Sequence, residues 1–201
     1  IHGMTKLTRG GFALPGTTLG YHTGTWRTQR PDHVHSAAPC HCACPAGEDP
    51  QAYIAELDEG HTRAAWETLV QVNPLPAITG RVCHHPCESG CNRGEYDEPI
   101  AIHSIERYLG DEAIAHGWDY PVTPPPANAA RVAVVGAGPA GLACAHRLAM
   151  HGHDVDLYDA RPKGGGLNEY GIAAYKTVDD FAQSEIDYIL SIGGIELRNN
   201  C

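Results

Sequence analysis

The sequence lacks a long apolar run, has few basic residues, and holds no carboxylate in its first 30 positions. No segment approaches the length of a membrane-spanning helix, and the Gly- and Thr-rich start has no apolar core of a secretory signal. With 14 Lys and Arg against 24 Asp and Glu, the formal net charge is -10, the wrong sign for a general nucleic-acid binder. We therefore expect no membrane span and no nucleic-acid partner.

Cysteine, by contrast, is plentiful: the chain has 8 Cys, most of them in two groups. The groups are "CHCAC" at residues 40–44 and "CHHPCESGC" at residues 83–91. Because nothing in the sequence indicates secretion, cysteines this close along the chain favour metal ligation over disulfides. The sequence therefore predicts a reduced protein located in the cytoplasm.

The composition divides the chain into four stretches. Residues 1–38 are rich in Gly, Thr and Pro and indicate an extended basic arm, whereas residues 39–119 combine the cysteine groups with short helical patterns. Residues 120–130 form a Pro-rich linker, the expected domain boundary. Residues 131–201 show strand, helix, strand, helix, strand, an order that predicts a parallel sheet with right-handed crossovers.

Three helices are expected in the cysteine-bearing stretch. Asp49 caps the first, which has Pro at its first position and ends at Gly60. The second covers residues 61–73, and the third starts at about Ile100, with isoleucines and a leucine spaced for one apolar face. The cysteine groups are then expected in loops that these short helices pack.

A glycine motif follows the first predicted strand, residues 132–135. Its members are Gly136, Ala137, Gly138, Pro139, Ala140 and Gly141, which match G-x-G-x-x-G. Gly136 permits a tight turn, Gly138 lets the backbone approach a pyrophosphate, and Gly141 lets the next helix pack closely on the strand. The free N–H groups at the start of that helix would face the phosphates, so the motif predicts a dinucleotide site.

The second predicted strand, residues 154–158, ends at Asp159. A carboxylate there accepts bonds from ribose hydroxyls and repels a 2'-phosphate, which favours FAD or NAD over NADP. The "KGGGLNEYGIAAYK" segment that follows is either a flexible loop or a loop that wraps the rest of a flavin. The next helix is expected to be capped by Thr177, and Cys144 is expected in the core.

The second cysteine group supplies Cys83, Cys87 and Cys91 on a looping turn, since Pro and Gly interrupt any continuous helix. The natural fourth ligand is Cys44, which precedes a proline. Four thiolates suit either an iron–sulfur cluster or structural zinc, and a neighbouring redox cofactor favours the cluster. We expect His84 and His85 to pack or form hydrogen bonds locally.

These residues resemble one family, that of the small (beta) subunit of NADPH-dependent glutamate synthase and the N-terminal half of dihydropyrimidine dehydrogenase. The similarity covers roughly residues 39–201, in "NPLPAITGRVC", "PCESGC", "IERY", "VGAGPAGL" and "GGL" followed by "YGI". The resemblance implies a helical [4Fe-4S] domain that leads into an incomplete Rossmann-like FAD-binding domain of two-dinucleotide-fold type. It also implies NAD(P)H as co-substrate, although the nicotinamide domain and the rest of the FAD domain do not follow in this chain.

The resemblance also implies ligands for the metal sites. One cluster would take Cys44, Cys83, Cys87 and Cys91. A second would take Cys40, Glu106 and two upstream cysteines. The upstream positions fall in "PDHVHSAA", which has none, so Cys42 and His35 are the available substitutes. One cluster is expected and a second is left open.

In the dinucleotide region the resemblance assigns Gly165, Gly166 and Leu167 to the flavin loop, and Lys176 to the place of an arginine near the flavin. The chain would then be an electron-transfer subunit that passes electrons between NAD(P)H, FAD, cluster and a partner oxidoreductase subunit. That partner carries further iron–sulfur clusters or the substrate site. The departures from the family pattern favour a partner other than the glutamate synthase large subunit, such as a 2-oxoacid dehydrogenase. The alternatives are a self-contained NAD(P)H-dependent flavin oxidoreductase and a zinc- and nucleotide-binding scaffold.

Overall fold

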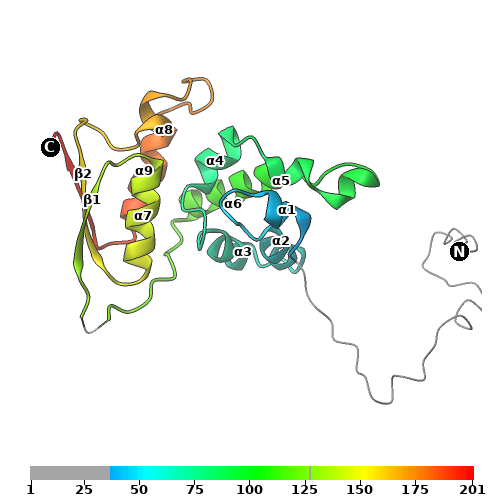
Figure 1. Ribbon diagram of the computed structural model, residues 1–201, viewed down its shortest axis with the longest axis horizontal. Coiled ribbons are helices and arrows are strands. Elements are labelled where there is room, and N and C mark those ends of the chain that lie inside the picture. Colours follow the sequence, from blue (N-terminus) through cyan, green and yellow to red (C-terminus); the bar gives the residue numbers. More distant parts are fainter. Residues whose placement is uncertain (1–36, 127) are drawn as a thin grey trace, which may run out of the picture. The chain divides into compact units, whose positions relative to one another are not determined.

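The computed structural model describes residues 37–126 and 128–201 (Figure 1). The predicted basic arm falls almost wholly outside these residues, and so does His35. Residues 37–201 form one compact unit. Within the described residues, no helix is long and apolar enough to cross a bilayer.

Residues 37–119, here called the helical region, contain six α-helices and one 3-10 helix among the described residues. They are α1 (Pro39–Ala43), α2 (Pro50–Asp58), α3 (Thr62–Leu69), α4 (Pro76–Val82), α5 (Pro86–Ser89), η3 (Asn92–Glu95) and α6 (Ile102–His116). Asp49 caps α2 as predicted, because its Oδ1 accepts the backbone N–H of Ala52 over 3.1 Å. The helix predicted from about Ile100 is α6.

Residues 131–201, here called the sheet region, alternate strands and helices. The elements are β1 (Arg131–Val135), α7 (Pro139–Met150), β2 (Asp154–Asp159), α8 (Leu167–Tyr170), α9 (Phe181–Leu190) and β3 (Ile195–Asn199). The sheet is parallel with order β1-β2-β3, and Val132 pairs with Val155, which pairs with Ile195. The predicted parallel α/β arrangement is thus confirmed.

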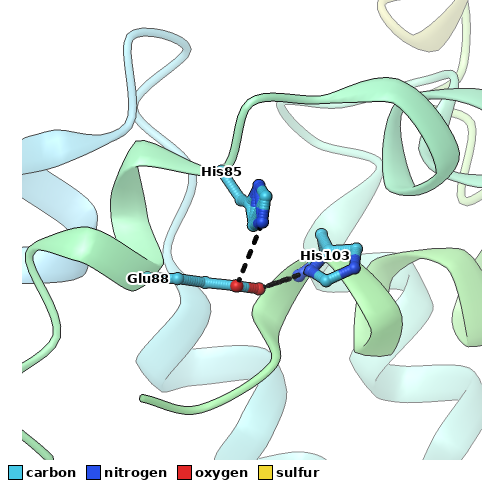
Figure 2. A group of neighbouring side chains, drawn as sticks. All are labelled: His85, Glu88 and His103. Atoms are coloured by element: carbon cyan, nitrogen blue, oxygen red, sulfur yellow. Dashed lines mark hydrogen bonds and ion pairs between the residues drawn. The ribbon is translucent and has the colours of Figure 1, made fainter. Parts of the chain in front are cut away.

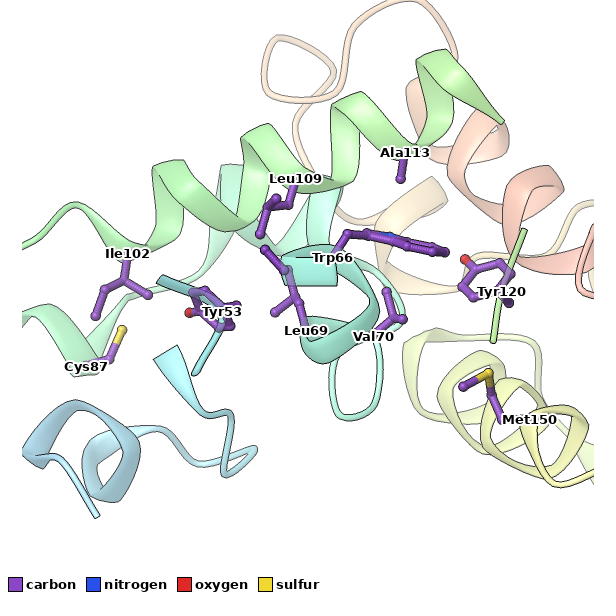
Figure 3. Close-up of a cluster of buried hydrophobic side chains, with 11 residues drawn as sticks. Tyr53, Trp66, Leu69, Val70, Cys87, Ile102, Leu109, Ala113, Tyr120 and Met150 are labelled. Carbon is purple, nitrogen blue, oxygen red and sulfur yellow. The ribbon is translucent and has the colours of Figure 1, made fainter. Parts of the chain in front are cut away.

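Two apolar cores hold the chain together. In the sheet region, Leu142 of α7 and Ile186 of α9 pack on Val155 and Leu157 of β2. The other core centres on Trp66, which is fully buried beside Leu69 and Leu109. Figure 3 shows this core with Cys87 and Ile102 at one end, and with Tyr120 and Met150 at the other. Since Met150 belongs to α7, the second core joins the helical region to the sheet region.

Several sequence predictions need correction. The second helix ends at Leu69 instead of residue 73, because Asn73 turns the chain: its side chain accepts the N–H of Leu75 and donates to Thr79. Thr177 caps no helix, since Asp179 and Asp180 have left-handed φ values of 57° and 58° and α9 starts only at Phe181.

The side of α7 on which Cys144 lies was also predicted wrongly. The buried residues of α7 are Leu142, Ala145, His146, Ala149 and Met150. Cys144 is two positions from Leu142, so it falls on the opposite face and is exposed. Likewise, Cys40, Cys42 and Cys87 lie in the short helices α1 and α5, not in loops.

Candidate functional site

Four cysteines lie in or next to the short helices α1, α4 and α5, and their common ligand role stays a prediction. Cys44 follows α1, Cys83 follows α4, Cys87 lies in α5, and Cys91 follows α5. Helix α5 lies close to α1, since a Cβ built on Gly90 would stand 3.2 Å from the Cβ of Ala43. All are free thiols, and four such donors fit a 4Fe-4S cluster.

The thiols influence each other through their charges. Burial, with smaller contributions from the nearby Glu106 and Cys44, raises the pKa of Cys87 to about 12. Burial likewise raises the pKa of Cys83, with a contribution from Cys44. In contrast, the backbone N–H groups of Ile100 and Arg93 lower the pKa of Cys91. Burial thus favours the protonated form of Cys83 and Cys87, whereas metal ligation requires the thiolate.

A buried pair of carboxyl groups adjoins these cysteines. Glu48 and Glu106 are each only 6 % exposed, and the hydroxyl of Tyr53 donates a 3.1 Å hydrogen bond to Oε1 of Glu106. Burial raises the pKa of Glu106 to about 8, and the negative charge of Glu48 adds to this shift. Burial also raises the pKa of Glu48. Two carboxyl groups in such a place retain a proton that solvent-exposed ones would lose.

Cys40 and Cys42 point in different directions. They are two residues apart on α1, and side chains at that spacing do not share a helix face. Cys40 packs against the helical core and lines a cavity of about 470 Å³ together with Cys91, Ile54 and Ile100. Cys42 is exposed. The two therefore do not form a pair of ligands on one side of α1.

A hydrogen-bonded group braces α5, the short helix that carries Cys87. Glu88 accepts the backbone N–H of His103 over 3.0 Å and lies 2.6 Å from His103 Nδ1, while His85 Nε2 is 3.5 Å from the other carboxyl oxygen (Figure 2). Burial opposes ionisation of Glu88, but the bonds to His103 outweigh it and lower its pKa. The ligand atoms lie within 4.8 Å of one another, a spacing that could hold a metal ion. Glu88 Oε1 and His103 Nδ1 are nevertheless hydrogen-bonded to each other. We therefore interpret the group as a structural contact that links α5 to the start of α6.

The glycine motif forms a turn between β1 and α7. Gly136 has φ of 101°, a left-handed value that favours glycine, and its N–H donates to the carbonyl of Tyr158 over 2.7 Å. A Cβ on Gly141 would collide with the carbonyl oxygen of Gly136. Space is open beside Gly138: a Cβ added there would lie 3.8 Å from its nearest neighbour, the Cα of Gly166. The turn thus leaves backbone N–H groups accessible at the start of α7.

Asp159 ends β2 and holds the glycine turn. Its Oδ2 accepts the N–H of Ala137 over 2.7 Å, and its Oδ1 accepts the N–H of Arg161 over 2.8 Å. Each carboxylate oxygen keeps a second lone pair for a hydroxyl donor. The predicted contact of Asp159 with a ribose stays a prediction.

The glycine-rich loop 164–166 lies against the turn. The N–H of Gly165 donates to the carbonyl of Ala137 over 2.6 Å, and a Cβ on Gly166 would stand 2.6 Å from Gly138 Cα. Beside it is a cavity of about 300 Å³ lined by Asp159, Arg161, Gly166, Leu167, Tyr170 and Gly171. The structure therefore brings the motif, Asp159 and the loop to one edge of the sheet, which fits a dinucleotide.

Lys176 does not line that cavity. It is exposed and lines a second cavity, of about 400 Å³, with Arg81, His103, Arg107 and Phe181. Sequence reasoning also missed Glu185, which is 1 % exposed. Its position gave a signal, since it lies three residues after Ala182 and four before Ile189, on the apolar face of α9.

Each of the two regions matches a known protein family model. Residues 32–118 match the family model described as dihydropyrimidine dehydrogenase domain II, 4Fe-4S cluster. Residues 134–180 match the model of the NAD(P)-binding Rossmann-like domain. In both regions the chain is thus similar to glutamate synthase small subunits and to dihydropyrimidine dehydrogenase. Its helical region is an iron–sulfur domain, and a Rossmann-like dinucleotide domain follows, as the sequence predicted.

Proteins similar to this chain include several oxidoreductase subunits. The chain is 38% identical over 182 residues to the NADPH-Fe(3+) oxidoreductase subunit beta of Geobacter sulfurreducens, a match that covers 87% of this chain and 27% of the relative. It is 36% identical over 178 residues to the NADP(+)-dependent formate dehydrogenase subunit beta of Moorella thermoacetica, covering 78% of this chain and 25% of the relative. It is 37% identical over 154 residues to the glutamate synthase [NADPH] small chain of Mycobacterium tuberculosis, covering 77% of this chain and 32% of the relative. The chain thus spans about a quarter to a third of the length of these relatives.

Proposed function

We propose that this chain is the electron-transfer part of a multisubunit oxidoreductase, in which FAD and a [4Fe-4S] cluster pass electrons between NAD(P)H and a partner subunit. The observation that carries the proposal is that one helical region contains Cys44, Cys83, Cys87 and Cys91 in or beside short helices, and that its core continues into the dinucleotide-binding region. A cluster and a dinucleotide held by one compact unit suit transfer between them.

The family match supports a cluster over a single zinc ion, since residues 32–118 match a domain described by its 4Fe-4S cluster. Around zinc, Zn–S bonds of about 2.3 Å place the thiolates of a tetrahedral site about 3.8 Å apart. In the described part of the chain, no three cysteine sulfur atoms lie within 4.8 Å of one another. A cluster of four irons and four sulfides needs thiolates that stand further apart than those around one ion.

The residues at the sheet edge support FAD as the dinucleotide that binds there. The carboxylate of Asp159 suits free ribose hydroxyls and opposes a 2'-phosphate, so the NADPH named for several relatives would bind elsewhere. The start of α7, Gly138 and Gly166 would hold the pyrophosphate, and Leu167 and Tyr170 lie where the remaining part of the cofactor would lie.

The chain's own residues supply placement and a dry environment. When bound, the flavin and the cluster supply the redox chemistry, because a flavin accepts a hydride and a cluster exchanges single electrons. The thiols of Cys83 and Cys87 would bind iron, Tyr53 orients the carboxyl group of Glu106, and burial keeps water away from this group. No side chain is assigned as a catalytic acid, base or nucleophile.

The names of the relatives support a subunit role. Each of the three is called a subunit or a small chain, so we infer that this chain also works beside oxidoreductase subunits that carry further clusters or the substrate site. All eight cysteines are free thiols, which suits the reducing cytoplasm as the proposed compartment.

The test is a measurement of cofactors in anaerobically purified protein. We expect flavin absorption, a broad absorption that dithionite bleaches, and about four irons with about four acid-labile sulfides per chain for one cluster. About eight of each would mean two clusters. A colourless protein that contains zinc would contradict the proposal. Turnover of a small molecule without any co-purifying subunit would favour the self-contained oxidoreductase.

A further inference from the structure

Helix α9 contacts the two cofactor-binding parts of the molecule with different faces. Ile186 packs with Leu142 and Leu157 in the core of the sheet region. Phe181, Glu185 and Tyr188, spaced four and three residues apart, share a neighbouring face. All three of these side chains contact the helical region.

Glu185 makes the central contact of that face. Its Oε1 accepts the backbone N–H of Ala77 over 2.8 Å, and its Oε2 accepts the N–H of Ile78 over 3.1 Å. These are first-turn amides of α4, which have no partner within their own helix. Because Glu185 is 1 % exposed, loss of these bonds would leave buried polar groups without partners.

Two further contacts flank Glu185. The guanidinium of Arg81 lies 4.0 Å from the ring centroid of Phe181 and also pairs with Asp111 over 2.7 Å. The hydroxyl of Tyr188 donates to the carbonyl of Trp118 over 2.6 Å. The face of α9 therefore contacts the helical region along its length.

Helix α4 connects the residues bonded to Glu185 with the proposed cluster ligand Cys83. It is a seven-residue helix that ends at Val82, directly before Cys83. It packs closely on α6, since a Cβ on Gly80 would stand 2.5 Å from the backbone nitrogen of Arg107. A shift at Ala77 would therefore move Cys83 with it.

The same helix holds the glycine-rich loop. Gln183 donates to the carbonyl of Gly164 over 3.0 Å and to Glu169 Oε2 over 2.8 Å. A Cβ on Gly165 would stand 2.8 Å from Ile186 Cδ1, so the loop lies directly on α9. One ten-residue helix thus contacts both the loop at the dinucleotide edge and the helix that leads to Cys83.

We propose that Glu185 is a positioning residue for electron transfer: through α9 it holds Cys83 and the loop 164–166 at a fixed separation, and this sets the distance from flavin to cluster. The inference rests on the proposed function, because it needs both cofactors. With both cofactors bound, single electrons would pass between flavin and cluster without any bond forming or breaking, and Glu185 would act only by holding the residues that bind them. The rate of such a step falls steeply with distance.

The test compares Glu185→Ala with Glu185→Gln and with Asp187→Ala, a control in which an exposed carboxylate of the same helix is removed. The first readout is hydrogen exchange of the Ala77 and Ile78 amides, which we expect to speed up only in Glu185→Ala. The second is the rate of cluster reduction after photoexcited deazaflavin reduces the flavin. We expect that rate to fall several-fold in Glu185→Ala, because electron transfer slows as the distance between the two cofactors grows. Glu185→Gln keeps an oxygen acceptor and should stay near the wild-type rate.

Iron, sulfide and flavin contents and the cluster potential are measured in every variant. An unchanged rate in Glu185→Ala would overturn the proposal, and so would a rate that falls only in proportion to lost iron or flavin. If Glu185→Ala does not fold, Gln183→Ala tests the contact between α9 and the loop 164–166 instead. A wild-type rate of cluster reduction in Gln183→Ala would then overturn the proposal. Wild-type protein without flavin or iron would instead overturn the proposed function.

Discussion

The hydroxyl of Tyr53 on α2 donates a 3.1 Å hydrogen bond to Glu106 on α6, and both residues are buried beside the cluster cysteines. Tyr53→Phe removes the donor and leaves a buried carboxyl oxygen without its partner. We expect the free energy of unfolding to fall by about 1 to 3 kcal/mol. Chemical denaturation of the cluster-loaded protein measures this. Tyr108→Phe, at a tyrosine that is 48% exposed, is the control, and an equal effect of both substitutions would contradict the prediction.

Removal of a cluster ligand should remove iron. We expect Cys87→Ser and Cys44→Ser each to lose nearly all iron of the one cluster, because a serine hydroxyl is a poor substitute for a thiolate ligand. Cys144→Ser should keep it, since Cys144 is exposed on the far face of α7. Iron and sulfide analysis of the purified variants decides. Loss of iron in Cys42→Ser as well would show that α1 supplies a ligand that the four-cysteine site does not include.

Two glycines of the dinucleotide motif should respond differently to alanine. In Gly141→Ala the new methyl group collides with the carbonyl oxygen of Gly136, so we expect a loss of stability of at least about 1–3 kcal/mol. In Gly138→Ala the methyl group makes only an ordinary contact of 3.8 Å with Gly166, and the backbone φ of -78° suits alanine. That variant should keep its stability within about 0.5 kcal/mol but bind less flavin, because the methyl group faces the pyrophosphate position.

Thermal unfolding and flavin content measured together separate the two effects. Full flavin binding in Gly138→Ala would contradict the placement of the pyrophosphate against this glycine.

The pH dependence of stability should reflect Glu185. Burial raises the pKa of this carboxyl group from 4.5 to about 8, while the N–H groups of Ala77 and Ile78 and the charge of Arg81 oppose the shift and Asp111 adds to it. Between these two values the folded state binds more protons than the unfolded state. The contribution to stability is therefore full below about pH 4.5 and is lost as the pH rises through about 8.

We expect stability to fall with rising pH by up to about 1.4 kcal/mol per pH unit from this group. Denaturant unfolding from pH 6 to 8 measures the slope. Glu185→Gln should have a shallower slope, because its amide does not titrate, whereas Asp187→Asn should match the wild type. Equal slopes in all three proteins would exclude the buried carboxyl group as the cause.

The part of the fold that follows from local chemistry could be predicted from the sequence. The strand, glycine turn and helix around Gly136 were expected because only glycine suits the turn and the close helix packing, and Asp49 was expected as a cap because its side chain acts within one turn. The four cluster cysteines were predicted from spacing and family resemblance, and the structure places them in or beside short helices, so their role as ligands stays a prediction.

What could not be predicted depends on tertiary neighbours. The burial of Glu106 follows from Tyr53 and Glu48, which are distant in sequence, and that of Glu185 follows from the free amides of α4. The exposed position of Cys144 depends on which face of α7 meets β2. Thr177 was expected to cap the next helix, but Asp179 and Asp180 have a left-handed backbone, so the helix cannot start before them. Non-glycine residues rarely adopt this conformation, and the sequence gives no sign of it.

The Pro-rich segment between the two regions is attached to the rest of the chain. Tyr120 is buried against Trp66 and Tyr188, Thr123 donates its N–H to the carbonyl of Met150 over 2.9 Å, and a Cβ on Gly152 would collide with Pro125. Cutting the chain here to express two separate halves would expose an aromatic surface on each. The sequence boundary is therefore a poor place to divide this protein, and the two halves are best purified and studied as one piece.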